Sequence, residues 1–436
     1  MSKDKTINAG PLTDKTATGG PLPGHLGNLT ADEKRKLQEA WSRLLKLCHD
    51  ADKETTNGTA TNGTHETPAK PADQNGHTPA NGHHHHHHHH HHLHHHQHTE
   101  NPAVPPSEFR QLLWNFVLAD HADVLVLRFL RARKWDINKA MDMLISALNW
   151  RHEHRLDEDI VRTGDRFSLT TPLTPDEKGF MAQYRSGKAY VRGSDKEGRP
   201  VFIIKVKLHD PKLQSPEAME RFVLHNIETI RSMIRHPDEK AALIFDLTGF
   251  GLKNMDFHVV KFLVQVFEAR YPEYLGVVLI HKAPWVFWGV WSIIKPWLDP
   301  VIASKINFTS SNSDMEKFIS QENLQKCYGG KDTFEYKYID PVEAAGEDRT
   351  KDEEKKAKLQ NEREELMRRF EGLTEEWAKL DPDSAEGKQK DVERGDLARE
   401  LRKSFWQLDP YVRARTYYHR AGVIGADGTV DLKAAR

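Results

Sequence analysis

The chain has 436 residues, in which 63 lysines and arginines nearly balance 64 aspartates and glutamates. This balance gives no sign of the strongly basic surface that nucleic-acid binding needs, so we expect no nucleic-acid partner. The two cysteines, Cys48 and Cys327, argue against a disulfide scaffold and for a reducing compartment. The first residues have no apolar stretch typical of a signal peptide, so we expect a cytoplasmic protein.

Two low-complexity segments flank one helix in the N-terminal quarter. Residues 1–28 are rich in glycine, proline, threonine and lysine, and we expect them to be disordered. A capping-box pattern at Thr30 and Glu33, followed by apolar residues at helical spacing, predicts a helix within 29–49. Residues 50–104 contain repeated Asn-Gly-Thr and a run of ten histidines, and we expect disorder there too. Imidazole is a common metal ligand, but a homopolymer fixes no coordination geometry, so we expect no metal site.

Residues 105–160 have the apolar periodicity of a small helical bundle. The spacing predicts helices over 108–117 and 122–132 and a third helix that begins after Asp136 as its N-cap. The third helix carries its apolar residues on one face, which must be buried against its neighbours.

Strands and helices alternate through residues 165–338. We expect strands at 188–193, 200–207, 241–247, 276–281 and 305–309, and helices at 216–235, 255–270, 285–295 and 313–319. Continuous apolar runs such as Val201–Ile204 are typical of strands buried on both faces. The turn Asp195–Gly198 favours a hairpin-like first pair. The alternation predicts an α/β fold with a mixed, largely parallel five-stranded sheet flanked by helices.

Residues 345–436 form a charged extension. Five apolar residues recur there every three or four positions: Leu366, Phe370, Leu373, Trp377 and Leu380. This stripe is too short for a coiled coil, so we interpret it as a helix that docks on the main domain. A second interpretation is that this helix binds a protein partner.

The motifs of common enzymes are absent from the sequence. No nucleophile elbow, Walker loop, zinc-protease helix or paired Cys-x-x-Cys occurs. The turn Gly249-Phe-Gly251 stands where a dinucleotide-binding loop would, but the third glycine of that pattern is Asn254. A simple glycine turn explains it, and we expect a protein that is not an enzyme and binds no cofactor.

The stretch from Gly276 to Leu298 is strongly apolar and holds four of the ten tryptophans. Its longest uncharged piece, Ala283–Ile294, is shorter than the roughly 20 residues that span a bilayer. We therefore expect a strand followed by an apolar helix.

The chain resembles the CRAL-TRIO family, in particular its Sec-fourteen-like phosphatidylinositol-transfer members. The resemblance covers residues 106–335 and is carried by Leu127–Asp136, Asp195–Val201, Tyr271–Gly276, Ala283–Pro284, Lys295–Pro300, Ser304–Lys305 and Tyr328–Gly330. It implies a helical bundle against a mixed sheet that encloses a lipid pocket. It also implies a non-catalytic carrier that moves phosphatidylinositol between membranes and binds membrane surfaces transiently.

The resemblance also implies a headgroup site formed by Glu273, Lys305, Arg133 and Lys134. A phosphodiester is bound by cationic donors, and inositol hydroxyls donate to a carboxylate. The alternatives are a structural ion pair between Glu273 and Lys305, and a solvated basic helix end at Arg133 and Lys134.

The apolar helix matches the family's mobile gate over the pocket. Its gate and membrane-contact residues are then Trp285, Phe287, Trp288, Trp291, Ile294 and Trp297. Tryptophan suits a membrane interface, whereas the alternative is an ordinary core helix.

Three positions that carry hydroxyl groups in choline-binding members are Ala241, Leu243 and Phe267 in this chain, and a phosphate-binding hydroxyl position is Ile302. We therefore expect no phosphatidylcholine exchange, and a second cargo that is another apolar lipid, such as a sterol precursor. A functional alternative to a carrier is a lipid-sensing regulatory module that presents phosphatidylinositol to a kinase or a partner protein.

Overall fold

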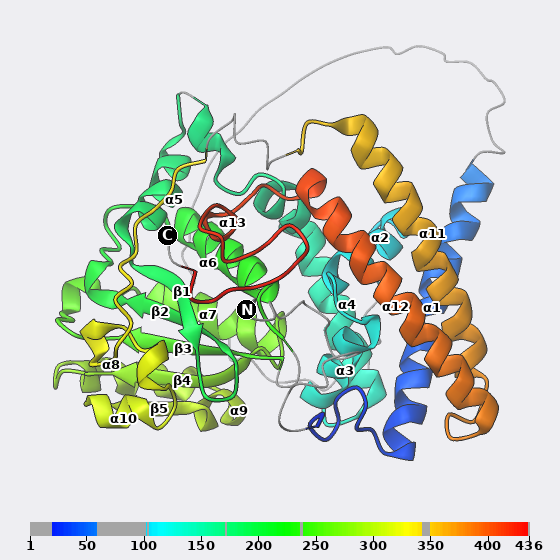
Figure 1. Ribbon diagram of the computed structural model, residues 1–436, viewed down its shortest axis with the longest axis horizontal. Coiled ribbons are helices and arrows are strands. Elements are labelled where there is room, and N and C mark those ends of the chain that lie inside the picture. The colour runs from blue at the N-terminus through cyan, green and yellow to red at the C-terminus, as the bar shows by residue number, and fades with distance from the viewer. Residues whose placement is uncertain are drawn as a thin grey trace, which may run out of the picture.

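The computed structural model describes residues 20–58, 102, 104–170, 172–235, 239–341 and 349–434. Its ribbon has two halves that lie side by side, a sheet covered by helices and a bundle of helices (Figure 1). The histidine run and most of the two segments expected to be disordered lie outside the described residues.

The five expected strands form one sheet in sequence order. The strands are β1 (Ala189–Ser194), β2 (Pro200–Lys205), β3 (Ala241–Asp246), β4 (Leu275–His281) and β5 (Ile306–Thr309). β1 pairs with β2 antiparallel, and the other neighbours pair parallel, so the predicted mixed and largely parallel sheet is confirmed. The hairpin turn is held by the Asp195 carboxylate, which accepts from the backbone N–H groups of Glu197 and Arg199. Gly198, with φ of 82°, supplies the left-handed residue that this turn needs.

Helices cover both faces of the sheet. They are α5 (Pro175–Ser186), α6 (Pro216–Arg231), α7 (Phe257–Ala269), α8 (Phe287–Ile294), α9 (Pro300–Ser304) and α10 (Asn312–Glu316). α5 and α9 were not among the predicted helices. One face packs on the segment that carries Met315, Leu324 and Tyr328, and the opposite face looks toward α6, α7 and α8. Neighbouring residues of one strand are therefore buried on opposite sides, which explains the continuous apolar runs.

The helical half contains α1 (Ala31–Gly58), α2 (Pro106–Val117), α3 (Ala122–Ala132) and α4 (Ile137–Glu153). The expected capping box opens α1, because the backbone N–H of Glu33 donates to Thr30 and that of Thr30 donates to Glu33. α1 continues past the predicted end at residue 49. Residues 20–28 are also ordered turns, contrary to expectation, and the Gly24 carbonyl accepts from Arg131 of α3 at 3.0 Å.

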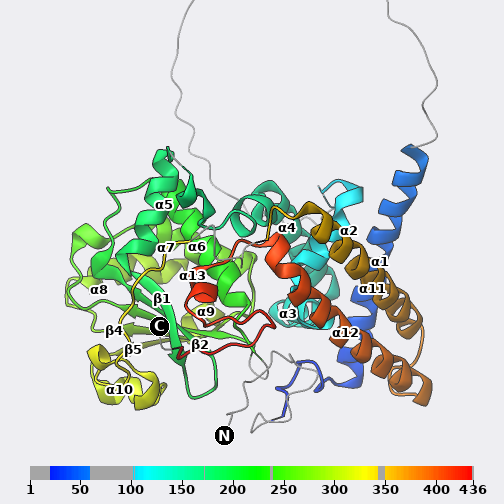
Figure 2. The same cartoon turned by 45° about the horizontal axis from the view of Figure 1, so that its top comes forward.

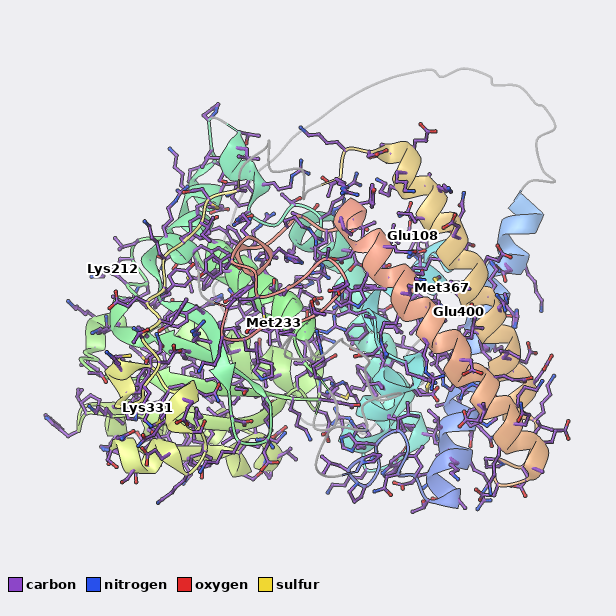
Figure 3. All side chains as sticks on the ribbon, viewed as in Figure 1. Glu108, Lys212, Met233, Lys331, Met367 and Glu400 are labelled. Carbon is purple, nitrogen blue, oxygen red and sulfur yellow. The ribbon has the colours of Figure 1, made fainter. Side chains whose placement is uncertain are left out.

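The C-terminal extension is built from α11 (Glu353–Ala378), α12 (Ala385–Val412) and α13 (Tyr417–Arg420). The apolar stripe of α11 packs on the helical bundle and not on the sheet, since the Phe370 ring meets the rings of Trp41 and Trp114 edge-on. α11 packs along α1 and α12 (Figure 1), and buried Met367 of α11, labelled in Figure 3, belongs to the same hydrophobic core as Trp41 and Trp114.

The last residues return from α12 to the sheet and cover its free edge at β1 (Figure 2). The Tyr418 hydroxyl accepts from the backbone N–H of Val191 at 2.8 Å, and the Leu432 carbonyl accepts from Gly193 at 2.9 Å. These bonds occupy backbone groups that an edge strand would otherwise leave open. The extension therefore belongs to both halves of the molecule.

A buried polar cluster joins the bundle to the sheet half. The Glu228 carboxylate on α6 accepts from Arg151 of α4 at 2.6 Å, from Arg231 at 2.8 Å and from the Tyr271 hydroxyl at 2.7 Å. Burial would raise the pKa of Glu228, but the two guanidinium groups hold it far below its usual value. Met233, next along this segment, is fully buried near the middle of the molecule (Figure 3).

Candidate lipid-binding site

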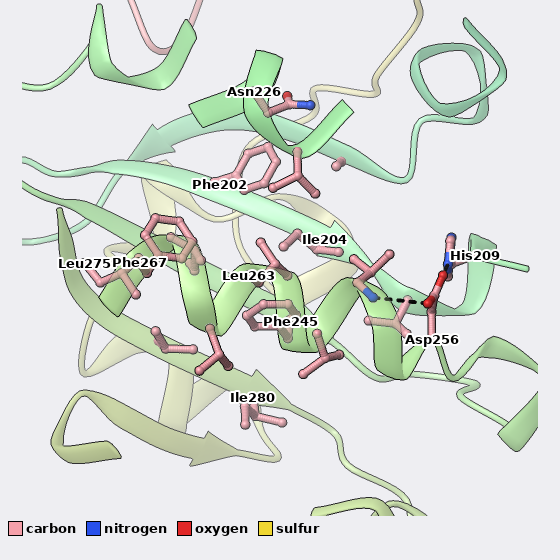
Figure 4. Close-up of a pocket in the computed structure, with 18 of the residues that line it drawn as sticks. Phe202, Ile204, His209, Asn226, Phe245, Asp256, Leu263, Phe267, Leu275 and Ile280 are labelled. Atoms are coloured by element: carbon pink, nitrogen blue, oxygen red, sulfur yellow. Dashed lines mark hydrogen bonds and ion pairs between the residues drawn. The ribbon is translucent and has the colours of Figure 1, made fainter. Parts of the chain in front are cut away.

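A cavity of about 260 Å³ lies between one face of the sheet and helices α6, α7 and α8. Its walls are almost entirely apolar, and Figure 4 shows Phe202 and Ile204 of β2 gathered with Leu263 and Phe267 of α7. Such a surface accepts hydrocarbon.

The strand alternation creates this wall. Phe202 and Ile204 face the cavity, whereas Ile203 between them packs in the core behind the sheet. On α6, Met219, Phe222 and Val223 recur at helical spacing and form the opposite wall. The cavity is therefore specified by the same apolar periodicity that forms the fold.

Helix α8 covers one side of the cavity with two different faces. Phe287, Trp291 and Ile294 line the cavity, and the Phe287 ring packs edge-on against Phe250. Trp288 on the other face of α8 is 47% exposed, and Trp285, which precedes the helix, is 86% exposed.

The remaining predicted gate residue, Trp297, is half-buried and packs against Phe257 with ring centroids 6.0 Å apart. α8 ends at Ile294, and the chain continues as a 3-10 turn over Lys295–Trp297. The regular helix thus ends one residue before the end expected at residue 295, because Pro296 lacks the N–H that would continue it.

A cationic cluster lies beside the cavity where β4 begins. Glu273 adopts a φ of 63° in the turn before β4, and its carboxylate lies 3.6 Å from the Lys240 ammonium and 3.9 Å from Nε of Arg131. Arg128 donates to the Glu273 carbonyl and places its guanidinium over the Tyr274 ring, which lines the cavity. Burial would raise the pKa of Glu273, but Arg131, Lys240 and Lys305 lower it, so the carboxylate stays ionised.

The structure brings two of the four predicted headgroup residues together. Lys305 stands where α9 meets β5, and its charge acts on the Glu273 carboxylate. Arg133 and Lys134 lie at the C-terminal end of α3, are exposed, and form no ion pair within the described residues.

Sequence reasoning missed Arg128, Arg131 and Lys240. Arg131 is the most informative of the three, because Nε and Nη2 are buried and have no hydrogen-bond partner among the described residues. Burial lowers the pKa of Arg131 to about 10. The helical spacing of Arg128 and Arg131 could have indicated a shared face, whereas no local pattern marks Lys240.

The glycine turn that resembles a dinucleotide loop is closed by its own side chains. The Asn254 amide oxygen accepts from the backbone N–H of Gly251, and its nitrogen donates to the His209 carbonyl. α7 begins only at Phe257, so the turn does not present a helix N-terminus to a phosphate. None of the described helices is both long and apolar enough to cross a bilayer.

Comparison with known proteins places this architecture in a family. The model of the CRAL/TRIO domain matches residues 184–330, and that of the CRAL/TRIO N-terminal domain matches residues 91–146. A CRAL-TRIO domain-containing protein of Schizosaccharomyces pombe is 40% identical over 73% of this chain and 69% of its own length. The chain belongs to the CRAL-TRIO family. A phosphatidylinositol transfer protein, CSR1 of Eremothecium gossypii, is 41% identical over 71% of this chain and 70% of its own.

Other similar proteins are matched over less of this chain. The SEC14 cytosolic factor of Yarrowia lipolytica is 32% identical over 48% of this chain and 43% of its own. The crystal structure of Sfh5 aligns with 55% of this chain and 82% of its own at 18% identity, with a TM-score of 0.38. In this CRAL-TRIO protein, the N-terminal family domain contains Arg128 and Arg131, and the second domain contains Lys240, Glu273 and Lys305.

Proposed function

We propose that this protein binds phosphatidylinositol and carries it between membranes as a cytoplasmic protein that docks on membranes transiently. The observation that carries the proposal is an apolar cavity, covered by an apolar helix, that adjoins a buried cationic cluster. The name of the relative from Eremothecium gossypii supports the same function.

The cationic cluster has the groups that an inositol phosphate needs. The N–H groups of Arg131 that have no hydrogen-bond partner among the described residues, together with Lys240 and Lys305, supply cationic donors for the phosphodiester. The ionised carboxylate of Glu273 accepts from inositol hydroxyls. Arg133 and Lys134, exposed beside this cluster, attract an anionic headgroup or membrane surface as it approaches.

The cavity takes the acyl chains. Each buried CH₂ contributes about 0.8 kcal/mol, which offsets the loss of the lipid's contacts in the bilayer. Ala241, Leu243, Phe267 and Ile302 all line the cavity and carry no hydroxyl group. Phosphatidylcholine therefore finds no side-chain hydroxyl at these positions, and an apolar lipid such as a sterol precursor is a better second cargo.

Helix α8 acts as the gate. Its inner residues touch the lipid, and exposed Trp285 and Trp288 enter the membrane interface, where tryptophan is favoured. Membrane binding then stabilises a displaced position of α8 and opens the cavity.

This function requires no bond-making residue, so the protein acts as a carrier and not as an enzyme. The alternative of a lipid sensor that presents phosphatidylinositol to a kinase has no feature of its own in its favour. A protein partner on the exposed charged surface of α11 and α12 stays a prediction, since the apolar stripe of α11 is already covered by the bundle.

We expect the wild type to move fluorescent phosphatidylinositol between two populations of vesicles without another protein. The double substitution Trp285→Ser and Trp288→Ser lowers this rate roughly tenfold or more, because two exposed aromatic anchors no longer enter the membrane. The matched control is Val392→Ser, since Val392 is exposed on α12, away from the sheet half. No transfer by the wild type refutes the carrier function, and an unchanged rate in the double variant refutes the gate assignment.

A further inference from the structure

A buried charge lies at another end of the same cavity. Lys188 lines the cavity and is only 6% exposed. Its ammonium group donates to the side-chain oxygen of Gln183 and to Nδ1 of His209, the latter at 3.1 Å. No described carboxylate forms an ion pair with it, although the charges of Asp256 and Asp210 act on it from farther away, and both of its hydrogen-bond acceptors are neutral.

The neighbours of Lys188 fix its protonation. Nε2 of His209 lies 2.8 Å from the Asp256 carboxylate and donates to it, which leaves Nδ1 unprotonated and able to accept from Lys188. Burial lowers the pKa of His209 and supports this neutral form. Burial lowers the pKa of Lys188 to about 8, so the amine is still charged near neutral pH.

Lys188 and Glu273 lie at opposite ends of the parallel strands. Lys188 precedes β1 and its carbonyl accepts from Lys205, so it stands at the carboxyl end of β2. Glu273 precedes β4, which runs parallel to β2 through β3, and therefore stands at the amino end. A six-residue strand such as β3 spans roughly 17 Å. Figure 4 accordingly shows His209 and Asp256 apart from Phe267 and Leu275.

A phospholipid held by its headgroup at Glu273 extends hydrocarbon toward Lys188. Hydrocarbon offers the Lys188 ammonium no acceptor, and a buried charge on which the carboxylates of Asp256 and Asp210 act only from a distance is costly. Phosphatidylinositol therefore does not account for the lysine.

We propose that Lys188, positioned by His209 and Asp256, binds the carboxylate of a long-chain fatty acid whose tail fills the cavity toward the opposite edge. The inference rests on the proposed function in that the cavity must hold lipid. A monoanionic carboxylate matches one enclosed ammonium, whereas a phosphate monoester would bring a second negative charge toward Asp256.

The test uses phosphatidylcholine vesicles that contain radiolabelled oleic acid or its methyl ester. The full-length protein is incubated with them, separated by gel filtration and counted. The wild type retains oleate in preference to the ester, and Lys188→Met lowers oleate retention roughly ten- to hundredfold. The Lys188→Arg variant keeps most of the oleate retention, because arginine keeps the positive charge. The matched control Lys212→Met retains oleate fully, because Lys212 is exposed on the loop before α6 and does not line the cavity.

Equal retention of oleate and methyl ester by the wild type overturns the inference, and so does equal oleate retention by the wild type and Lys188→Met. If Lys188→Met does not fold, the comparison of oleate with its methyl ester on the wild type tests the inference by itself. Phosphatidylinositol transfer by the wild type without oleate retention refutes this inference alone. A wild type that neither transfers phosphatidylinositol nor retains oleate refutes the proposed function as well.

Discussion

Substitution of Lys305 by alanine is expected to lower phosphatidylinositol transfer roughly ten- to hundredfold while the protein stays folded. The reason is the loss of a charged donor to the headgroup phosphate, since hydrogen bonds to charged groups contribute about 1.5–3 kcal/mol. Lys305 stands at the surface end of β5, and the core does not depend on its side chain. Transfer of a fluorescent lipid between vesicles measures the rate, and circular dichroism measures the fold.

Lys317→Ala is the matched control for this experiment. Lys317 is an exposed lysine that follows α10 directly, and it pairs with nearby Asp314, at 3.9 Å. We expect the control to transfer phosphatidylinositol at the wild-type rate. A folded Lys305→Ala variant with undiminished transfer means that Glu273 and Lys305 form only a structural pair.

The largest loss of stability is expected from Arg394→Met in α12. The guanidinium of Arg394 is fully buried and forms two hydrogen bonds with the Asp123 carboxylate of α3, at 2.6 and 3.0 Å. The indole of Trp41 on α1 donates to the same carboxylate at 2.7 Å. Removing one partner of a buried ion pair costs about 3–5 kcal/mol, because the other charge is left uncompensated. Urea unfolding followed by circular dichroism measures the free energy of unfolding.

Arg399→Met provides the comparison on the same helix. Arg399 is exposed and pairs with Asp396 one turn away, and such surface pairs contribute at most about 1 kcal/mol. A loss in Arg394→Met no larger than in Arg399→Met contradicts the conclusion that α12 is an integral part of the bundle.

The sequence predicted the fold where the signal is local. The capping box at Thr30 and Glu33 and the N-cap Asp136 specify where helices begin, and both are formed by the side chains expected. The predicted end of α1 was wrong, because a side chain of α2 binds a residue of α1 beyond that end. Arg110 of α2 donates two hydrogen bonds to Asp52, a contact that the local sequence around α1 does not reveal.

Some residues of the candidate site could be predicted from the sequence, and others could be found only in the structure. Glu273 and Lys305 came from resemblance to family motifs, and the charge of Lys305 helps to lower the pKa of Glu273. Arg131 and Lys240 could be assigned to the site only from the structure, in which α3 and the start of β3 bring them close to the Glu273 carboxylate. His209 bonds both Lys188, which lies 21 positions before it in the chain, and Asp256, which lies 47 positions after it. No spacing rule connects residues so far apart, because only the folded chain brings them together.

The central claim is that the cavity carries phosphatidylinositol, and mass spectrometry of the lipids that copurify with the protein tests it most directly. We expect phosphatidylinositol in the wild type and its loss from the Glu273→Ala, Lys305→Ala double variant. A wild-type protein that carries only neutral apolar lipid contradicts the claim and returns Glu273 and Lys305 to a structural role.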